Sequence, residues 1–458
     1  MEKEEIGIIL EKQKQFFKSG KTLDLNYRSD ILKKLRLQII ENEQEIKDAL
    51  WKDFHKPGCE VLSSEIQFVL KELNLAIRKL RKWARPRRVK TPIVHFIASS
   101  YVFLQPYGQV LVLSPWNFPF QLSLVPVLSA LAAGNCVVLK TSQRVPFTSG
   151  IIEKILSRLP DELVVTINGD HSISEYLLDY KFDYIFFTGS TTVGKYVMGK
   201  AAANMIPVSL ELGGKSPCIV AADAKLDFAA KRIAWGKFYN AGQTCVAPDY
   251  IVADIKIRDE LLALLAREIK SFYGENPQQS DDLPRVINSQ SVQRLASLMN
   301  EGRLVIGGTC DEKDGYVAPT IIRDIRPDDH IMQQEIFGPV LPVIDFKEFN
   351  EVYSIIERNP NPLAVYIFTR NKKLAREFLM RTKSGSAAIN DTVIQFASPY
   401  LPFGGVGSSG MGRYHGKSSF ETFSNERGVM VKSNLIDLFL RYPPYSKLKE
   451  KAFKLFMR

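Results

Sequence analysis

Cys245 is the residue of this chain best suited to nucleophilic chemistry. It is one of five cysteines and ends the small, glycine-containing segment 239–245, where a backbone can approach a ligand closely. A single cysteine is more often a small buried apolar residue than a nucleophile. As a thiolate, however, Cys245 could attack a carbonyl carbon, and three other segments supply the polar groups that such a reaction needs.

These partners are an amide and two carboxylates. The oxyanion formed by attack on a carbonyl needs donors, and the backbone N–H of Cys245 and the side-chain amide of Asn117 are the candidates. Glu211 lies between two leucines, so burial would raise its pKa and make it a base for a hydrolytic water. Glu335 could hold a ribose. The alternatives are an aromatic turn at Asn117, a structural salt bridge at Glu211 and a capped turn at Glu335.

Two further features could hold a nucleotide. Gly189, Ser190 and Gly194 lie where a predicted strand is followed by a helix, and the free N–H groups and dipole of that helix would favour a pyrophosphate. The spacing is not G-x-G-x-x-G, so an ordinary strand-to-helix turn is the alternative. Lys140 ends another predicted strand, where a cation could contact ribose hydroxyls or phosphate. The alternative for Lys140 is a solvated side chain.

Short apolar strands and helices alternate along most of the chain. In the first series we expect strands at 110–113, 136–139, 164–167 and 184–189, with helices at 122–133, 148–159, 174–178 and 193–203. In the second series, which starts near residue 208, we expect strands at 217–220, 250–253, 304–306, 340–344 and 364–368, with helices at 228–237 and 258–271. This alternation predicts an α/β fold: a doubly wound parallel-sheet dinucleotide-binding domain and a second α/β domain that carries Cys245.

The remaining segments flank these two series. Apolar spacing predicts helices over 25–54 and 61–83. The segment 86–107 is predicted to be a two-stranded β excursion. The run 404–412 is too rich in glycine for the interior of an element, so we expect a loop.

Composition narrows the class of protein. The chain has 458 residues and a net charge of +11, and much of the excess charge lies in the clusters 78–88 and 447–458. The first cluster could be a nucleic-acid patch, but no binding module surrounds it and a solvated helix end is favoured. Five widely spaced cysteines without a C-x-x-C pair favour a reducing compartment. The five histidines are scattered, so no metal site is predicted.

Membrane signals are weak. The charged N-terminus lacks the apolar stretch of a signal peptide, and no segment has the ~18 apolar residues needed to span a bilayer. The stretch 435–458 alternates apolar and basic residues. It could lie on an anionic membrane surface, but packing on the protein or fraying is favoured.

The order of these motifs resembles that of the aldehyde dehydrogenase superfamily over nearly the whole chain. The motifs 186–190, 210–217, 243–245 and 335–339 are close to the family patterns. The segment 402–412 and the following residues 414–417 are similar to the class 3 and fatty-aldehyde group. Each motif is weak alone, and the ordered set is specific.

The resemblance implies a role for each candidate residue. Cys245 would form a thiohemiacetal and then a thioester, Asn117 would hold the oxyanion, and Glu211 would activate water. The cofactor, NAD or NADP, would contact Lys140, Gly189, Ser190, Gly194, Glu335, Phe337 and Trp116. Tyr239 and Phe403 would line the substrate region, which Trp116 would also help to shape.

The resemblance also implies an organisation. It places an NAD(P)-binding domain at 1–85 and 108–208, a catalytic domain at 209–415, an oligomerisation arm at 86–107 and 416–435, and a tail at 436–458. We expect a cytoplasmic homodimer that takes a small-molecule aldehyde, binds no nucleic acid and touches membranes at most peripherally through the tail. The apolar lining favours a medium- or long-chain aliphatic or an aromatic aldehyde.

One departure from the family pattern concerns the cofactor. After Lys140 the family usually has Pro-Ser-Glu, whereas this chain has Thr141, Ser142 and Gln143. A neutral Gln143 would not repel a 2′-phosphate as a glutamate would, so we expect NADP to be accepted as well as NAD. The alternatives to this enzyme are an acyl-transferring relative, a cysteine hydrolase and a non-catalytic binding protein. The presence of Glu211 argues against the first, and no histidine stands out as the base for the second.

Overall fold

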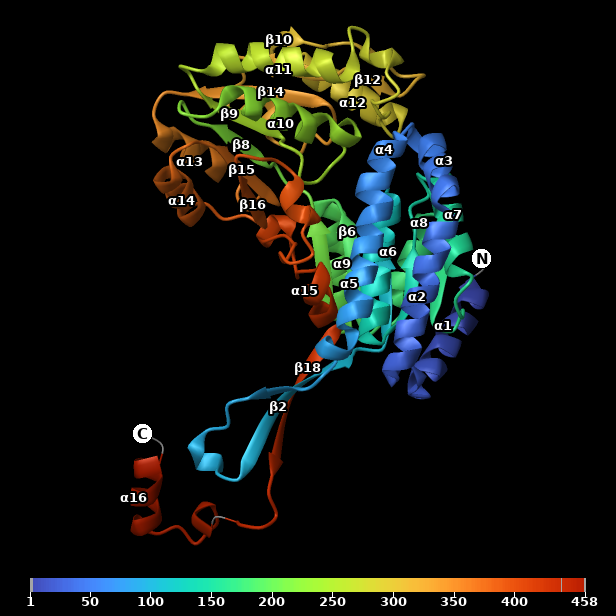
Figure 1. Ribbon diagram of the computed structural model, residues 1–458, viewed down its shortest axis with the longest axis vertical. Helices are drawn as coiled ribbons and strands as arrows, with labels where there is room; N and C mark the ends of the chain where they lie inside the picture. The colour runs from blue at the N-terminus through green and yellow to red at the C-terminus, as the bar shows by residue number, and fades with distance from the viewer. Residues whose placement is uncertain (1–2, 438, 457–458) are drawn as a thin grey trace.

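The first of two α/β units is built on a six-stranded sheet. The computed structural model describes residues 3–437 and 439–456, and Figure 1 shows this unit below the second one. The strand order is β17-β7-β6-β3-β4-β5, and all pairs are parallel except β17 with β7. The strands are β3 (Gln109–Leu113), β4 (Cys136–Lys140), β5 (Val164–Ile167), β6 (Tyr184–Gly189), β7 (Val208–Leu212) and β17 (Gly410–Met411).

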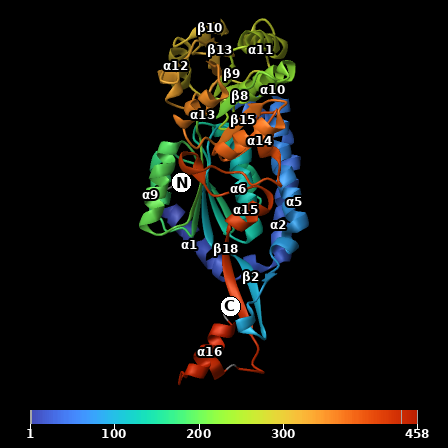
Figure 2. The same ribbon diagram turned by 90° about the vertical axis from the view of Figure 1, so that its left-hand side faces the viewer.

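Helices cover both faces of this sheet, as Figure 2 shows. One face carries α1 (Lys3–Lys18), α8 (His171–Asp179) and α9 (Thr191–Ala203). The other carries α2 (Leu25–Glu41), α3 (Glu43–Phe54), α5 (Gln67–Trp83), α6 (Pro119–Ala133) and α7 (Pro146–Leu156). Alternate residues of β3 serve the two faces, since Leu111 and Leu113 pack in the first core and Val110 and Val112 in the second. This is the period of two expected of a strand buried on both sides.

The second unit has a seven-stranded sheet in the order β10-β13-β14-β9-β8-β15-β16. Its strands are β8 (Pro217–Val220), β9 (Tyr250–Asp254), β10 (Arg303–Ile306), β13 (Thr320–Arg323), β14 (Val340–Phe346), β15 (Ala364–Phe368) and β16 (Ser386–Ile389). Its helices are α10 (Leu226–Phe238), α11 (Arg258–Tyr273), α12 (Ser289–Met299), α13 (Phe349–Glu357) and α14 (Lys372–Arg381). The pairs are parallel except at β10. The predicted fold class is confirmed.

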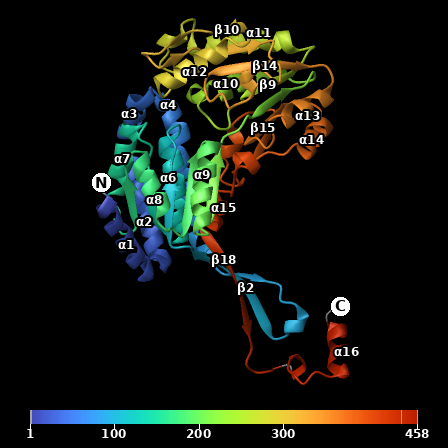
Figure 3. The same ribbon diagram turned by 180° about the vertical axis from the view of Figure 1, so that it is seen from behind.

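A three-stranded arm extends away from both units (Figure 1, Figure 3). It consists of β1 (Arg87–Val89), β2 (Ala98–Pro106) and β18 (Ser424–Lys432), all antiparallel. All nine residues of β2 pair with the distant β18, and only three of them also pair with β1. The chain then continues to the short helix α16 (Lys447–Phe456). In the described part of the chain, no helix is long and apolar enough to cross a membrane.

Three boundaries differ from those expected. The helical stretch expected over 25–54 is interrupted at Asn42, which separates α2 from α3. The division expected after residue 208 falls inside β7, which pairs with β6 in the first sheet. Residues expected in the arm from 416 instead begin with α15 (Gly416–Thr422), which packs on α5 and α6, because its Phe420 is buried there.

The glycine-rich run 404–412 is not a loop throughout. Gly410 and Met411 form β17, which pairs with Glu211 and Leu210 of β7. Gly410 has a φ of 130°, and a Cβ there would collide with the carbonyl oxygen of Leu210. Only glycine fits this approach of two backbones, so the composition that predicted a loop instead permits a strand next to Glu211.

Candidate active site

The nucleophile loop joins α10 to β9 and has an unusual backbone. Asn240, Ala241 and Gly242 have φ values of 55°, 51° and 71°, in the left-handed region. Such a conformation costs about 1–3 kcal/mol for a residue with a Cβ and needs support from its surroundings. Part of that support is close packing, because a Cβ on Gly242 would collide with the carbonyl of Gly338. The loop that carries Cys245 is therefore seated on the loop that carries Glu335.

Asn117 lies between β3 and α6 and is buried beside the nucleophile loop. Its side-chain amide donates to the carbonyl of Gln243 at 3.0 Å. The amide of Asn240 donates in turn to the carbonyls of Asn117 at 2.8 Å and Gln243 at 3.1 Å. An amide carries two N–H donors, so one amide hydrogen of Asn117 is left without a partner among the described residues.

Cys245 is half-buried and held as a thiol. Burial raises its pKa to about 12, and the charges of Glu335 and Glu211 raise it further, while the N–H groups of Cys245 and Val246 oppose the rise. The thiolate is the reactive form. Nucleophilic attack by Cys245 therefore requires a base to take the thiol proton.

Glu211 is a buried carboxylate whose charge acts on the Cys245 thiol. It is 4% exposed, and neither carboxylate oxygen has a hydrogen-bond partner among the described residues. Burial raises its pKa well above the usual value, and the charge of Arg413 opposes this. Burial raises the pKa of the Tyr414 hydroxyl well above its usual value, and the charges of Glu211 and Cys245 add to the rise. These groups therefore belong to one buried cluster, in which Tyr414 had no role predicted from sequence.

Glu335 is held by a network beneath its loop. Its carboxylate lies against Gly213. Burial raises its pKa to about 8 and the charge of Asp249 adds to the rise, whereas the N–H of Gly214 opposes it. The buried ion pair of Lys215 and Asp249, at 2.5 Å, contacts the backbone on both sides of Glu335.

The two contacts of that ion pair define its role. Lys215 donates to the carbonyl of Gln334 at 3.0 Å, and Asp249 accepts from the N–H of Ile336 at 3.0 Å. Sequence reasoning missed both members of the pair. The available signal was a charged residue within each of two apolar, motif-bearing segments, because such residues are buried only when they are paired.

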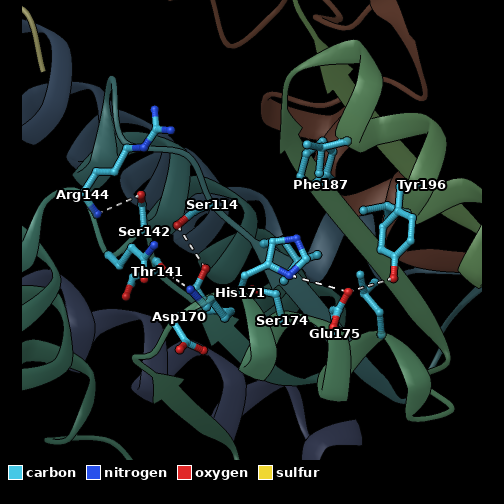
Figure 4. A pocket seen from close by; sticks show the side chains of 16 residues that line it. Ser114, Thr141, Ser142, Arg144, Asp170, His171, Ser174, Glu175, Phe187 and Tyr196 are labelled. Atoms are coloured by element: carbon cyan, nitrogen blue, oxygen red, sulfur yellow. Dashed lines mark hydrogen bonds and ion pairs between the residues drawn. The ribbon is translucent and has the colours of Figure 1, made fainter. Parts of the chain in front are cut away.

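A cavity of about 230 Å³ opens at the carboxyl ends of β3, β4 and β6 (Figure 4). The crevice beyond the carboxyl ends of parallel strands is where doubly wound folds bind nucleotides. Lys140 lines the cavity and donates to the carbonyls of Gly169 at 2.6 Å and Thr141 at 2.9 Å. An ammonium has three donors, so one remains for a ligand. Gln143 and Arg144 line the same cavity.

The remaining predicted cofactor residues lie beside this cavity or nearer the nucleophile. Ser190 caps the N-terminus of α9 by accepting from the N–H of Val193 at 3.4 Å. Gly189 ends β6, and Gly194 is buried in the first turns of α9. Trp116 and Phe337 contact one another edge to face, with centroids 5.4 Å apart, so these two aromatic rings join the Asn117 loop to the Glu335 loop.

The predicted substrate residues lie in two apolar groups. Tyr239 stacks on Phe118 with centroids 6.2 Å apart, in a small cluster with Leu122. Phe403 stacks on His415 with centroids 5.3 Å apart. Among the described residues, no group of three or more His, Cys, Asp or Glu side chains is placed to hold a metal ion.

Comparisons with known proteins define the class to which this site belongs. The aldehyde dehydrogenase family pattern matches residues 1–429. The 4,4'-diaponeurosporen-aldehyde dehydrogenase of Staphylococcus aureus is 41% identical over 448 residues, covering 97% of each chain. Aldehyde dehydrogenase family 3 member B1 of Mus musculus is 42% identical, covering 95% of this chain and 94% of that protein. The chain therefore belongs to the aldehyde dehydrogenase family and is an enzyme of the NAD(P)-dependent aldehyde dehydrogenase class.

Solved structures agree. The substrate-bound state of Staphylococcus aureus AldH superposes with a TM-score of 0.97 at 40% identity, covering 99% of each chain. An NAD+ complex of a Bacillus cereus aldehyde dehydrogenase superposes with a TM-score of 0.86 at 26% identity, covering 94% of this chain and 89% of that one. The predicted resemblance to this family, including its class 3 group, is confirmed.

Proposed function

We propose that this chain oxidises a medium- or long-chain aliphatic or aromatic aldehyde to the carboxylic acid through a thioester on Cys245. The observation that carries the proposal is the grouping of three components. The loop that carries Cys245 is hydrogen-bonded to Asn117. In the described part of the chain, one amide hydrogen of Asn117 and both carboxylate oxygens of Glu211 have no partner. A thiol, an oxyanion donor and a buried base are the parts that acyl chemistry with water requires.

The first half of the reaction forms the covalent intermediate. A base takes the thiol proton, Cys245 Sγ bonds to the carbonyl carbon, and the C=O π electrons move to oxygen. The Asn117 amide and the Cys245 N–H hold that oxyanion. A nicotinamide cofactor held near this carbon would supply the acceptor for its hydrogen and two electrons. The C=O bond then re-forms, and the substrate remains on Cys245 as a thioester.

The second half releases the acid. Glu211 takes a proton from a water molecule. The oxygen of that water bonds to the thioester carbon at the same time. The same two donors hold the second oxyanion. When the C=O bond re-forms, the C–S bond breaks and the Cys245 sulfur is reprotonated. The protons balance in this step, because Glu211 gains one proton from water and the Cys245 sulfur receives one proton.

The residues present fit a dinucleotide. Lys140 has a free donor in the cavity beyond β4 and would contact the ribose or phosphate, with Gly189, Ser190 and Gly194 near the pyrophosphate. Glu335 would hold the ribose at the nucleophile end, beside the Trp116–Phe337 pair. NADP is proposed as well as NAD, because neutral Gln143 and cationic Arg144 line the cavity, although Asp170 and Glu175 lie there too.

The wider organisation is also a proposal. The arm strands β1, β2 and β18 would join two subunits into a homodimer, since β18 leaves one edge without a strand partner in the described chain. The units built on the first and second sheets would be the NAD(P)-binding and catalytic domains. The protein would act in the cytoplasm, with the tail touching membranes at most peripherally.

The deciding experiment follows the reduced-nicotinamide absorbance with hexanal or benzaldehyde and either cofactor. The signal should grow in the wild-type protein and vanish in Cys245→Ala, which should still bind the cofactor. Turnover retained in Cys245→Ala would refute the assigned nucleophile. No signal with short, long and aromatic aldehydes would favour an acyl-transferring or a non-catalytic protein.

A further inference from the structure

A second cavity lies outside the catalytic cluster. Its volume is about 620 Å³, within the range of about 300–1,000 Å³ common for small-ligand sites. It is bounded by the C-terminal half of α5, by α15, by β2 at the base of the arm and by the segment that contains Tyr400. Figure 1 shows α5, α15 and the arm meeting there. The chemistry proposed above uses no residue whose side chain lies in the rim of this cavity.

The inner wall of the cavity is apolar and aromatic. Leu75 is buried, and Trp83 and Leu104 are half-buried. His415 also lines it, is 1% exposed, and makes no hydrogen bond through either ring nitrogen in the described chain. Burial lowers the pKa of His415 to about 3, although the backbone of Phe396 opposes part of the decrease. The wall is therefore uncharged, with one unsatisfied polar group.

The outer rim of the cavity is cationic. It is formed by part of the basic cluster at 78–88, namely Lys79, Lys82, Arg85 and Arg87. These four side chains make no ion pair or side-chain hydrogen bond within the described residues. Of the two acids on the rim, Glu421 is paired with Lys417, and only Glu426 is left to offset the four cations. A recess with this charge concentrates anions.

The cavity is separated from the catalytic cluster by a layer of aromatic rings. His415 stacks on Phe403 at 5.3 Å and contacts Tyr414 at 4.2 Å, both between ring centroids. Burial raises the pKa of the Tyr414 hydroxyl, and the charges of Glu211 and Cys245 add to the rise. A molecule in the cavity would thus lie one ring layer from the groups that produce the acid, without occupying their site.

We propose that this cavity binds a single-chain amphiphile with a carboxylate head, the head on the cationic rim and the chain along the apolar wall. Cations together with an adjoining apolar wall suit this class, because burial of the alkyl chain is favourable and the carboxylate head pairs with the rim. Nucleic acid would leave the apolar wall unused. The basic tail around α16 would be repelled by the rim.

The identity of the class rests on the proposed function, because oxidation of an aliphatic aldehyde yields such a carboxylate. The binding itself needs neither cofactor nor turnover. A failure to bind is therefore distinguishable from a failure to oxidise: the first is measured with dodecanoate alone, and the second with aldehyde and cofactor.

The test is calorimetric titration of the full chain with dodecanoate below its micelle concentration. Wild-type protein, the double variant Lys82→Glu/Arg85→Glu and the control Arg78→Glu are compared. Arg78 lies on α5, as Lys82 does, but does not line the cavity. We expect the double variant to weaken binding about tenfold or more and the control to leave it unchanged. Dodecanol lacks the carboxylate head, and acetate lacks the long alkyl chain. Both should bind much more weakly than dodecanoate.

Three results would overturn the proposal. One is no binding of dodecanoate to the wild-type chain. Another is equal binding of dodecanol, which would mean that the rim does not recognise charge. The third is displacement of dodecanoate by an aldehyde with no effect of the double variant, which would place the fatty acid at the catalytic cluster instead.

Discussion

The side-chain amide of Asn240 donates a hydrogen bond of 2.8 Å to the carbonyl of Asn117, 123 residues away in the chain. The same amide donates to the carbonyl of Gln243, which also accepts from Asn117. Asn240 therefore ties Asn117 to the loop that carries Cys245, and we propose that it positions the proposed oxyanion donor. Its left-handed backbone is one that asparagine tolerates better than most residues.

Replacing Asn240 by alanine should loosen both loops. We expect kcat to fall about 10–100-fold with little change in KM, because a misplaced donor is felt most in the transition state. Asn117→Ala, which removes the donor itself, should lower kcat about 100–1,000-fold. Steady-state kinetics of both variants check this. An unchanged kcat in Asn240→Ala, with the protein folded, would remove its positioning role.

Glu211→Gln should separate the two halves of the reaction. The variant should still form the thioester but not hydrolyse it, so stopped-flow absorbance should show a burst of about one reduced cofactor per site and then a slow phase. Glu72→Gln, which changes a buried acid that has no role in the proposed reaction, should turn over without a burst. Loss of the burst itself in Glu211→Gln would place Glu211 in the first half, as the base for the thiol.

The raised pKa of Glu211 also predicts the direction of the pH profile. A base acts only when deprotonated, and burial raises the pKa of Glu211. The hydrolytic rate should therefore increase as pH rises through that pKa and lose this rising limb in Glu211→Gln. Single-turnover measurements of thioester hydrolysis across pH check it.

Gln143→Glu should shift cofactor preference towards NAD. A carboxylate in the cavity that contains Lys140 would repel a 2′-phosphate, so kcat/KM for NADP should fall about tenfold or more while that for NAD changes little. Measuring both specificity constants in both proteins tests the idea. A wild-type preference for NAD above about a thousandfold would show that Gln143 does not permit NADP.

Glu72 should make stability depend on pH. Its carboxylate accepts from the N–H of Gly416 at 2.9 Å, but burial raises its pKa to about 7. The folded state thus binds the proton more tightly than the unfolded state, so the free energy of unfolding should fall as pH rises from about 5 to 7. The slope from one such group is at most about 1.4 kcal/mol per pH unit. Urea unfolding of the wild type and Glu72→Gln should show a shallower dependence in the variant, and identical slopes would contradict this.

The sequence alone determined the alternation of elements and the motifs. Apolar runs of four to six residues marked β5, β6, β8 and β15 at their bounds, because a strand buried on both faces leaves a continuous signature in the chain. The ordered motifs around Asn117, Glu211, Cys245 and Glu335 were recognisable for a related reason, since each carries a reactive type in an apolar or glycine-rich setting.

Only the tertiary structure decided what depends on contacts between distant segments. β17 was not predicted, because it lies in a glycine-rich run. It is a strand because its backbone pairs with β7, and its own side chains do not favour a strand. Other features also depend on contacts between distant segments. They are the hydrogen bonds from Lys215 and Asp249 to the loop of Glu335, those of Asn240 to the Asn117 segment, and the second cavity beside the basic cluster. Such contacts leave no periodic pattern and no local propensity in the sequence, so they could not be predicted from it.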